Sequence, residues 1–181
     1  MKYPAHIIGG ITFGIVSHHM VIKHLPIMQY NSTPLLVFSF IAGSLFGSLL
    51  PDIDHRGSYL GRRLPFISWI ANATMGHRGA THAPLVTIMI TLILLFLSSK
   101  LLSGTYELCA LLIVLGMAVG AISHLFLDSL TKSGIPLFYP FTSKHYRLAR
   151  MKTGGIGETL TTLGMIIFVI WFFSKHYITN V

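Results

Sequence analysis

The chain of 181 residues is 52% hydrophobic and only 10% charged, and it carries a formal net charge of +8. A soluble globular protein has about 25% charged residues, so this composition excludes an ordinary soluble domain and predicts a protein embedded in a bilayer. The length suits one compact helical domain over residues 1–181. The sequence lacks the aromatic and basic pattern of a nucleic-acid module, so nucleic acid is not an expected partner.

Apolar segments are predicted to form helices at 5–22, 35–50, 84–99, 106–130 and 159–173. A helix that spans the lipid needs about 20 apolar residues, so the fourth segment is long enough and the second is short. The expected fold is all-α, a polytopic membrane helical bundle of four to five spans with a metal site at one membrane face. In the four-span alternative, residues 5–22 lie in or under the membrane interface.

The polar segments fall on one side of the membrane if the chain crosses it five times. That side then receives His6, residues 51–83 and residues 131–158, together with ten of the 13 lysines and arginines. The positive-inside rule makes this side cytoplasmic. Its positive charge suits an anionic membrane lipid or a phosphate-bearing substrate as partner.

The fourth apolar segment ends with His124 and Asp128, which lie four residues apart and therefore on one face of a helix. An imidazole and a carboxylate so placed can bind one divalent ion. The structural alternative is a hydrogen bond between them that tightens helix packing. The chain has only five acidic residues, and three of them stand near histidines in sequence. This clustering favours metal binding over the structural hydrogen bond.

A second polar cluster, Asp52 and Asp54 with His55 beside them, directly follows the second apolar segment. The alternative is a helix end with solvated acids. The chain after His55 is rich in arginine, and a loop is expected from there to Gly76.

The third cluster consists of His77 and His82 on either side of Gly79. Thr81 or His82 is the expected N-cap of the next helix, whose first turn contains Pro84. A histidine at a helix start should be neutral, which is the form that binds metals. Two solvated loop histidines are the alternative.

These clusters supply three imidazoles and two or three carboxylates, a sufficient set of ligands for two divalent ions. Two ions about 4 Å apart can share a hydroxide and bind the oxygens of a phosphoester. Neighbouring arginines, especially Arg78, would hold the remaining phosphate charge. Glu158 opens the last helix and either acts on the water or only interacts with the positive end of that helix.

The polar motifs together resemble the YdjM family of bacterial inner-membrane proteins, which is described as membrane-bound, metal-dependent hydrolases. The resemblance extends from His6 to about Glu158 and rests on His6 and residues 50–55, 76–82, 123–128 and 131–140. The family is also distantly similar to zinc-dependent phospholipase C and its nuclease relatives. That likeness implies that His6 is a ligand. The chain lacks the HxxxE string and the N-terminal tryptophan of those enzymes, so two ions are expected.

With the resemblance added, the prediction is a metal-dependent hydrolase at the cytoplasmic face of the bacterial inner membrane. It would cleave a phosphoester of a lipid with water activated by zinc, or by manganese or magnesium. Arg78 and Arg147 would bind the phosphate, and Glu158 would orient or deprotonate the water. The expected metal ligands are His6, Asp52, Asp54, His77, His82, His124 and Asp128.

Two alternatives remain at this stage. In the first, the protein is a non-catalytic lipid carrier or regulator, and the metal or an ion network only holds its helices together. In the second it is an ion transporter, since acids inside a membrane can mark an ion pathway. The position of the acids at helix ends speaks against transport.

Overall fold

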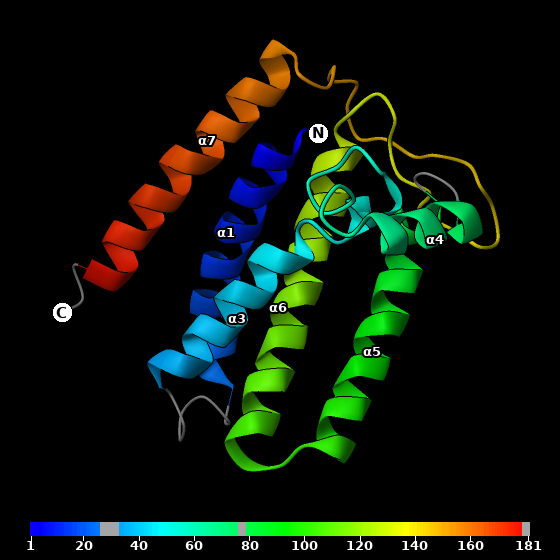
Figure 1. Cartoon of the computed structure of the whole chain (residues 1–181). Coiled ribbons are helices and arrows are strands. Elements are labelled where there is room, and N and C mark those ends of the chain that lie inside the picture. Colours follow the sequence, from blue (N-terminus) through cyan, green and yellow to red (C-terminus); the bar gives the residue numbers. More distant parts are fainter. Residues whose placement is uncertain (26–32, 76–78, 179–181) are drawn as a thin grey trace.

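The computed structural model describes residues 1–25, 33–75 and 79–178, and helices dominate it (Figure 1). The described residues contain no β-strand, only two isolated bridges in the segment after α6, so the predicted all-α class is confirmed. The α-helices are α1 (Tyr3–Met20), α3 (Pro34–Gly47), α4 (Pro65–Met75), α5 (Pro84–Leu101), α6 (Gly104–Ser129) and α7 (Ile156–Phe173). Short 3-10 helices are η1 (Ile22–His24), η2 (Pro51–Asp54) and η3 (Ala80–His82), and η4 (Ser174–Ile178) is a π-helical turn.

Five helical segments are long and apolar enough to cross a membrane, which supports the five-span version of the prediction. The second predicted span is longer than the sequence indicated, because η2 continues the helical path of α3 to Asp54. The resulting segment of 21 residues would reach about 31 Å if wholly α-helical, close to the thickness of the hydrocarbon core. The candidate spans are Tyr3–His24, Pro34–Asp54, Pro84–Leu101, Gly104–Ser129 and Ile156–Ile178.

Helices α3 and α6 touch backbone to backbone through glycines spaced four residues apart on each helix. A Cβ atom on Gly116 would lie 2.1 Å from the Phe40 carbonyl oxygen, and one on Gly120 would lie 2.0 Å from the Ser44 oxygen. From the other side, a Cβ on Gly47 would lie 2.2 Å from the Met117 oxygen. Small residues at this spacing let two membrane helices approach closely, and close approach increases their dispersion contacts.

Helix α1 packs into the groove that α3 and α6 form. The Ser44 hydroxyl of α3 donates a hydrogen bond of 2.8 Å to the Gly10 carbonyl of α1. A buried apolar cluster near the other end of these helices joins Ile22, Phe40 and Leu112. These contacts make α1, α3 and α6 the rigid core of the bundle.

Helices α5 and α7 lie at the edges of the bundle (Figure 1). No residue of α5 is fully buried, and α5 packs mainly against α6. Helix α7 packs against α1 and buries Glu158, Val169 and Phe172. In a bilayer the apolar outer faces of both helices would contact lipid.

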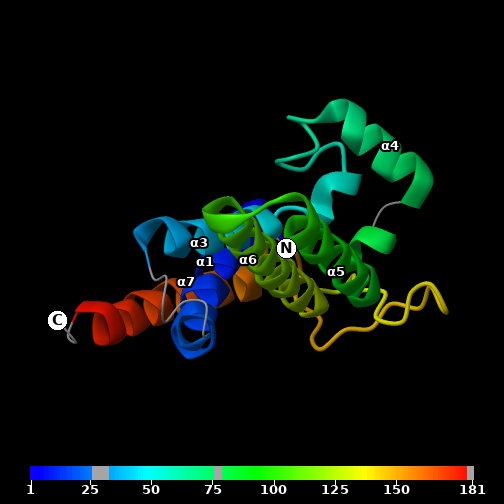
Figure 2. The ribbon, with the colours of Figure 1, turned by 90° about the horizontal axis from the view of Figure 1, so that it is seen from below.

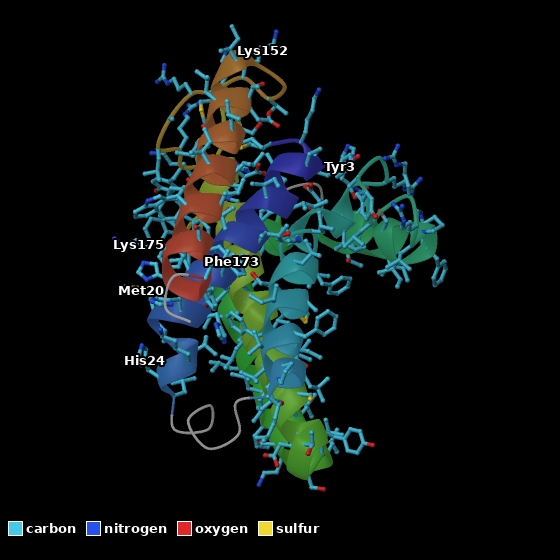
Figure 3. The ribbon with its side chains drawn as sticks, turned by 90° about the vertical axis from the view of Figure 1, so that its left-hand side faces the viewer. Tyr3, Met20, His24, Lys152, Phe173 and Lys175 are labelled. Carbon is cyan, nitrogen blue, oxygen red and sulfur yellow. The ribbon has the colours of Figure 1, made fainter. Side chains whose placement is uncertain are left out.

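The chain segments that carry the predicted clusters meet at one end of the bundle. Figure 1 shows the N-terminus, η2, α4 and the segment between α6 and α7 at the end where α6 finishes. Figure 3 shows Tyr3 and Lys152 toward this end and Met20 and His24 toward the other. The expectation that these clusters share one end is therefore met for the described residues.

Helix α4 corrects the prediction of a loop from His55 to Gly76. It lies across the end of the bundle and projects from it sideways (Figures 1 and 2). Its side chains Phe66 and Trp69 are 70% and 50% exposed, which suits a helix in the membrane interface. Eleven residues are too few for a span, and a loop was therefore expected, although Phe66, Ile67 and Ile70 recur at helical spacing.

The start of α5 also differs in detail from the prediction. Its N-cap is Ala83, and Pro84 occupies the first helical position as expected. Thr81 and His82 belong to η3, a separate turn before the cap. The side chain of His82 can therefore turn inward, away from the start of α5.

The glycine contact between α3 and α6 gives a direct test. Gly120→Ala should lower the free energy of unfolding by about 1–3 kcal/mol, because the new methyl group meets a rigid backbone oxygen. The matched variant Gly164→Ala in α7 has nothing within 4 Å of its new Cβ and should gain about 0.5–1 kcal/mol. Thermal unfolding in detergent measures both, and equal stability of the two variants would contradict the close contact.

Candidate metal centre

Two overlapping groups of buried histidine and aspartate side chains lie where α6 ends. Within each group, one ligand atom per residue lies within 4.8 Å of the others. The first group consists of His6, Asp52 and His124, and the second consists of His82, His124 and Asp128. His124 belongs to both groups, so the two form one centre to which α1, η2, η3 and α6 all contribute.

His124 is held in one orientation by the end of α3. Its Nδ1 atom lies 2.7 Å from the Ser48 carbonyl oxygen, and because a carbonyl only accepts, Nδ1 carries the proton. The other nitrogen, Nε2, is then a lone-pair donor. It is buried and makes no hydrogen bond among the residues the structure describes. It lies 3.7 Å from Asp52 Oδ1 and 3.8 Å from Asp128 Oδ2.

His6 stacks on His124, with ring centroids 3.7 Å apart. Its Nε2 atom lies 3.2 Å from the Met1 carbonyl oxygen and 3.5 Å from Asp128 Oδ1. Its buried Nδ1 atom has no hydrogen-bond partner within the described part of the chain. The Met1 amino group also donates to Asp128 Oδ1. This side of the centre therefore presents an unused imidazole nitrogen beside that of His124.

His82 lies between carboxylates on both sides of its ring. Its Nε2 atom is 3.6 Å from Asp52 Oδ1 and 3.6 Å from Asp128 Oδ2. Its Nδ1 atom is 3.1 Å from Thr81 Oγ1 and 3.6 Å from Asp54 Oδ2. Burial opposes a charge on His82, but Asp52 and Asp54 outweigh it and raise its pKa above the ordinary value. The position between these carboxylates favours positive charge.

The distances fit a shared cation better than direct hydrogen bonds. Separations of 3.6–3.8 Å between His and Asp atoms exceed normal hydrogen-bond lengths. Two ligands bound to a tetrahedral zinc at about 2.0–2.2 Å lie about 3.3–3.6 Å apart, close to these values. The side chains of His6, His82, His124 and Asp128 have no exposed area, and that of Asp52 is 21% exposed. Buried His and Asp groups of this arrangement could therefore hold a metal ion.

Asp54 lies behind His82 and outside both groups. Its Oδ2 atom accepts a hydrogen bond of 2.7 Å from the Thr81 hydroxyl, and its carbonyl accepts one of 2.9 Å from Asn72 of α4. The structure thus places it where it orients the His82 ring, as outer carboxylates do around metal-binding histidines.

Glu158 and Arg147, two other predicted residues, belong to neither group. Both carboxylate oxygens of Glu158 accept backbone hydrogen bonds of 2.7 Å, from Lys2 and Gly154. Arg147 is exposed and donates to the Lys132 carbonyl at 3.0 Å. The predictions for two further residues, His77 and Arg78, fall outside the described residues.

Three contributors to the centre were missed from the sequence: the Met1 backbone, Ser48 and Thr81. Ser48 contributes a backbone carbonyl, which every residue has, so no sequence signal could have identified it. Thr81 contributes its hydroxyl to Asp54 and contacts His82, whereas the sequence assigned it only a possible capping role. Its position directly before His82 was the available signal.

Comparison with known proteins finds one matching family and several relatives. The model of a family described as "YdjM inner membrane protein" matches residues 1–179. The "Uncharacterized protein YvsG" of Bacillus subtilis is 30% identical over 173 residues, which cover 96% of this chain and 94% of the relative. The "Inner membrane protein YdjM" of Escherichia coli is 32% identical over 145 residues, 77% of this chain and 71% of the relative. No solved structure is significantly similar.

The sharing of His124 between the groups predicts different metal losses. We expect His6→Ala and His82→Ala each to weaken zinc binding, because each removes a ligand from one group, and His124→Ala to abolish it, because it removes the ligand common to both groups. Elemental analysis of purified protein measures this, and circular dichroism checks that each variant is folded. His145→Ala, which removes an exposed histidine, is the matched control. Full metal content in folded His124→Ala would disprove the assignment.

The placement of Asp54 predicts a weaker effect of its removal. Asp54→Asn keeps all proposed ligands but removes the charge behind His82, so zinc affinity should fall by about 10- to 100-fold. Competition with a fluorescent chelator measures the affinity. Glu107→Gln removes the same charge at the other end of α6 and should leave the affinity unchanged. An equal effect of both variants would show that Asp54 acts only through net charge.

Proposed function

Because the chain belongs to the YdjM family of inner membrane proteins, we propose that it is a metal-dependent hydrolase that cleaves a phosphoester of a lipid. The family and the five apolar helices support a multi-pass location in the inner membrane. A substrate within the same membrane can reach the centre without leaving the bilayer. Hydrolysis of a membrane lipid is therefore the reaction that best fits this location.

The observation that carries the proposal is the pairing of two three-residue groups through His124. A single structural ion needs only one closed group of four ligands. The Nε2 atom of His124 can bind an ion in only one group at a time, and an ion held by either group has three protein ligands, which leaves a coordination position for water or substrate. This composition is typical of hydrolytic rather than purely structural metal sites.

The residues of the centre would have different roles in the hydrolysis. A divalent ion bound at the centre would lower the pKa of a water molecule and polarise the phosphoester, and where two ions bind, Asp52 or Asp128 rather than His124 would bridge them. Asp52, the partly exposed member, borders the side from which a substrate arrives. His124 and Asp128 fix the inner side through the bond to Ser48 and the packing of α6. Arg147, and Arg78 in the proposal from sequence, would bind phosphate oxygens.

Glu158 receives a different role in this proposal from the one expected. Its two oxygens accept N–H groups from Lys2 and Gly154, and these two bonds hold the carboxylate between the starts of two helices. It joins the start of α1 to the start of α7. We therefore assign it as a positioning residue that keeps His6 and the first helix in place.

We further propose that the centre faces the cytoplasm. The segments around it contain most of the lysines and arginines of the chain, and the positive-inside rule retains such segments on the cytoplasmic side. The substrate would then be a lipid of the inner leaflet, where anionic headgroups are attracted to the basic segments.

A second function is favoured by the burial of the centre. The side chains of His6, His82, His124 and Asp128 are wholly enclosed, and enclosed metal sites are commonly structural. In this alternative the ion holds α1, η3 and α6 together in a lipid carrier or regulator, and no bond is cleaved. Removal of the ion would then unfold the protein.

Activity in proteoliposomes separates the two functions. Protein in vesicles of phosphatidylethanolamine and phosphatidylglycerol should release water-soluble phosphate compounds when zinc or manganese is present. A chelator should stop the release while the protein stays folded. Arg147→Ala should reduce turnover by about 10- to 100-fold, because one charged hydrogen bond to phosphate is lost. The control is Lys175→Ala, which removes a cation in η4, directly after the end of α7 that is remote from the centre. Unfolding by the chelator with no release would favour the structural role.

A further inference from the structure

A cavity of about 430 Å³ lies between α4, α5, α6 and η2. Its volume falls within the range of about 300–1,000 Å³ typical of small-molecule sites. Helix α4 contributes Ile67 and Ile70, α5 contributes Ile90 and Leu94, and α6 contributes Met117. No residue of this cavity was singled out as a ligand site from the sequence, so the cavity is a separate feature of the fold.

The side chains that line the cavity suit a hydrocarbon ligand. The polar side chains that line the cavity are threonines, and each has its hydroxyl engaged within the protein. Thr74 donates to Ile70 O at 2.8 Å, and Thr91 donates to Thr87 O at 2.8 Å. Thr87 and Thr81 likewise donate to Ala83 O and Asp54 Oδ2. An occupant would find apolar surface and few unused hydrogen-bonding groups.

One end of the cavity adjoins the metal centre. Pro51, Ile53 and Thr81 line the cavity, whereas their chain neighbours Asp52 and His82 belong to the centre. In η2 and η3, neighbouring residues therefore line the cavity and the metal centre alternately. A molecule with a hydrocarbon part in the cavity would have its polar end close to Asp52, the partly exposed member of the centre.

The other side of the cavity opens where lipid would lie. The lining residues Ile67, Ile70 and Ile90 are 51%, 42% and 50% exposed, and α5 has no buried residue. From Val86 to Leu94 the cavity follows α5 for about 12 Å. Half of a hydrocarbon core is about 15 Å, so the cavity has the depth of most of one leaflet.

Helix α4 lies at the height where a headgroup would rest. It crosses the end of the bundle beside the cavity, and its exposed Phe66 and Trp69 suit the interface between lipid and water (Figures 1 and 3). The exposed Arg62 and Arg63 immediately precede it and can interact with phosphate. The apolar cavity, these two arginines and the candidate metal centre therefore lie at the same end of the bundle.

We propose that this cavity binds one acyl chain of a membrane phospholipid, which enters sideways from the bilayer between α4 and α5. The second chain stays in the bilayer, and the phosphoester comes to rest beside Asp52. The inference rests on the proposed function only for what happens at the phosphoester. The substrate class is then a lipid with at least one long acyl chain. This lipid passes beneath α4 on its way from the bilayer to the centre.

Photo-crosslinking in a bilayer tests acyl-chain binding independently of catalysis. The probe is a phosphatidylglycerol with a diazirine midway along one chain, in vesicles of phosphatidylethanolamine and phosphatidylglycerol. Mass spectrometry should locate adducts on the cavity residues Ile90, Leu94 and Met117 at about ten times the yield on Ile167 and Ile170 of α7. These α7 residues are 61% and 64% exposed, so they report random contact with lipid.

A filled cavity provides the matched comparison. Thr91→Phe places a ring in the cavity and should reduce cavity adducts about tenfold. The control is Ser98→Phe, two turns further along α5 and outside the cavity lining. The Ser98 hydroxyl donates to Leu94 O at 2.8 Å, so both substitutions remove the same kind of hydrogen bond. Ser98→Phe should leave the adducts unchanged. Circular dichroism confirms that both variants are folded.

The remaining outcomes separate this inference from the proposed function. Cavity adducts without any lipid hydrolysis support the acyl-chain site and contradict the hydrolase. Hydrolysis with adducts spread evenly over α5 and α7 contradicts the site and leaves the hydrolase standing. Loss of chemical cross-links between protein copies in Thr91→Phe, with no lipid adducts in the wild type, would show that a second copy of the chain fills the cavity, and would overturn the inference.

Discussion

The backbone contact between α3 and α6 is the constraint on which the rest of the structure depends. In a lipid environment helices gain little from burying apolar surface, so close packing and hydrogen bonds must hold them together. Here Gly116 and Gly120 bring α6 within contact of the α3 backbone, and Ser44 adds a hydrogen bond to α1. Three helices thereby form a frame in which the ends of α3 and α6 have fixed relative positions.

That frame determines the geometry of the centre. The end of α3 presents the Ser48 carbonyl to His124, and the next residues place Asp52 opposite the same ring. Carboxylates and imidazoles inside an apolar bundle are costly unless they are paired or bind a cation. The frame holds these groups together at separations suited to a shared ion, whereas loop-borne groups of the same types could move apart.

Some of this was predictable from the sequence, and some was not. The spans followed from hydrophobicity, and the pairing of His124 with Asp128 followed from a spacing of four residues on one helix. The convergence at one end followed from counting crossings. Helix α4 was missed because its 11 residues are too few for a span, although its apolar residues recur at helical spacing. The tautomer of His124 and the place of Asp54 behind His82 depend on tertiary contacts, which spacing does not encode.

The stacking of His6 on His124 has a consequence for how the protein is made. One ring belongs to α1 and the other to the last turns of α6, which the ribosome makes about 100 residues later. While the ribosome is still translating α5, the chain in the membrane has Asp52 in place but not its counterpart from α6. Both ligand groups are therefore complete only after α6 has been synthesised. A chain that terminates before α6 would leave Asp52 without the His124 ring that faces it.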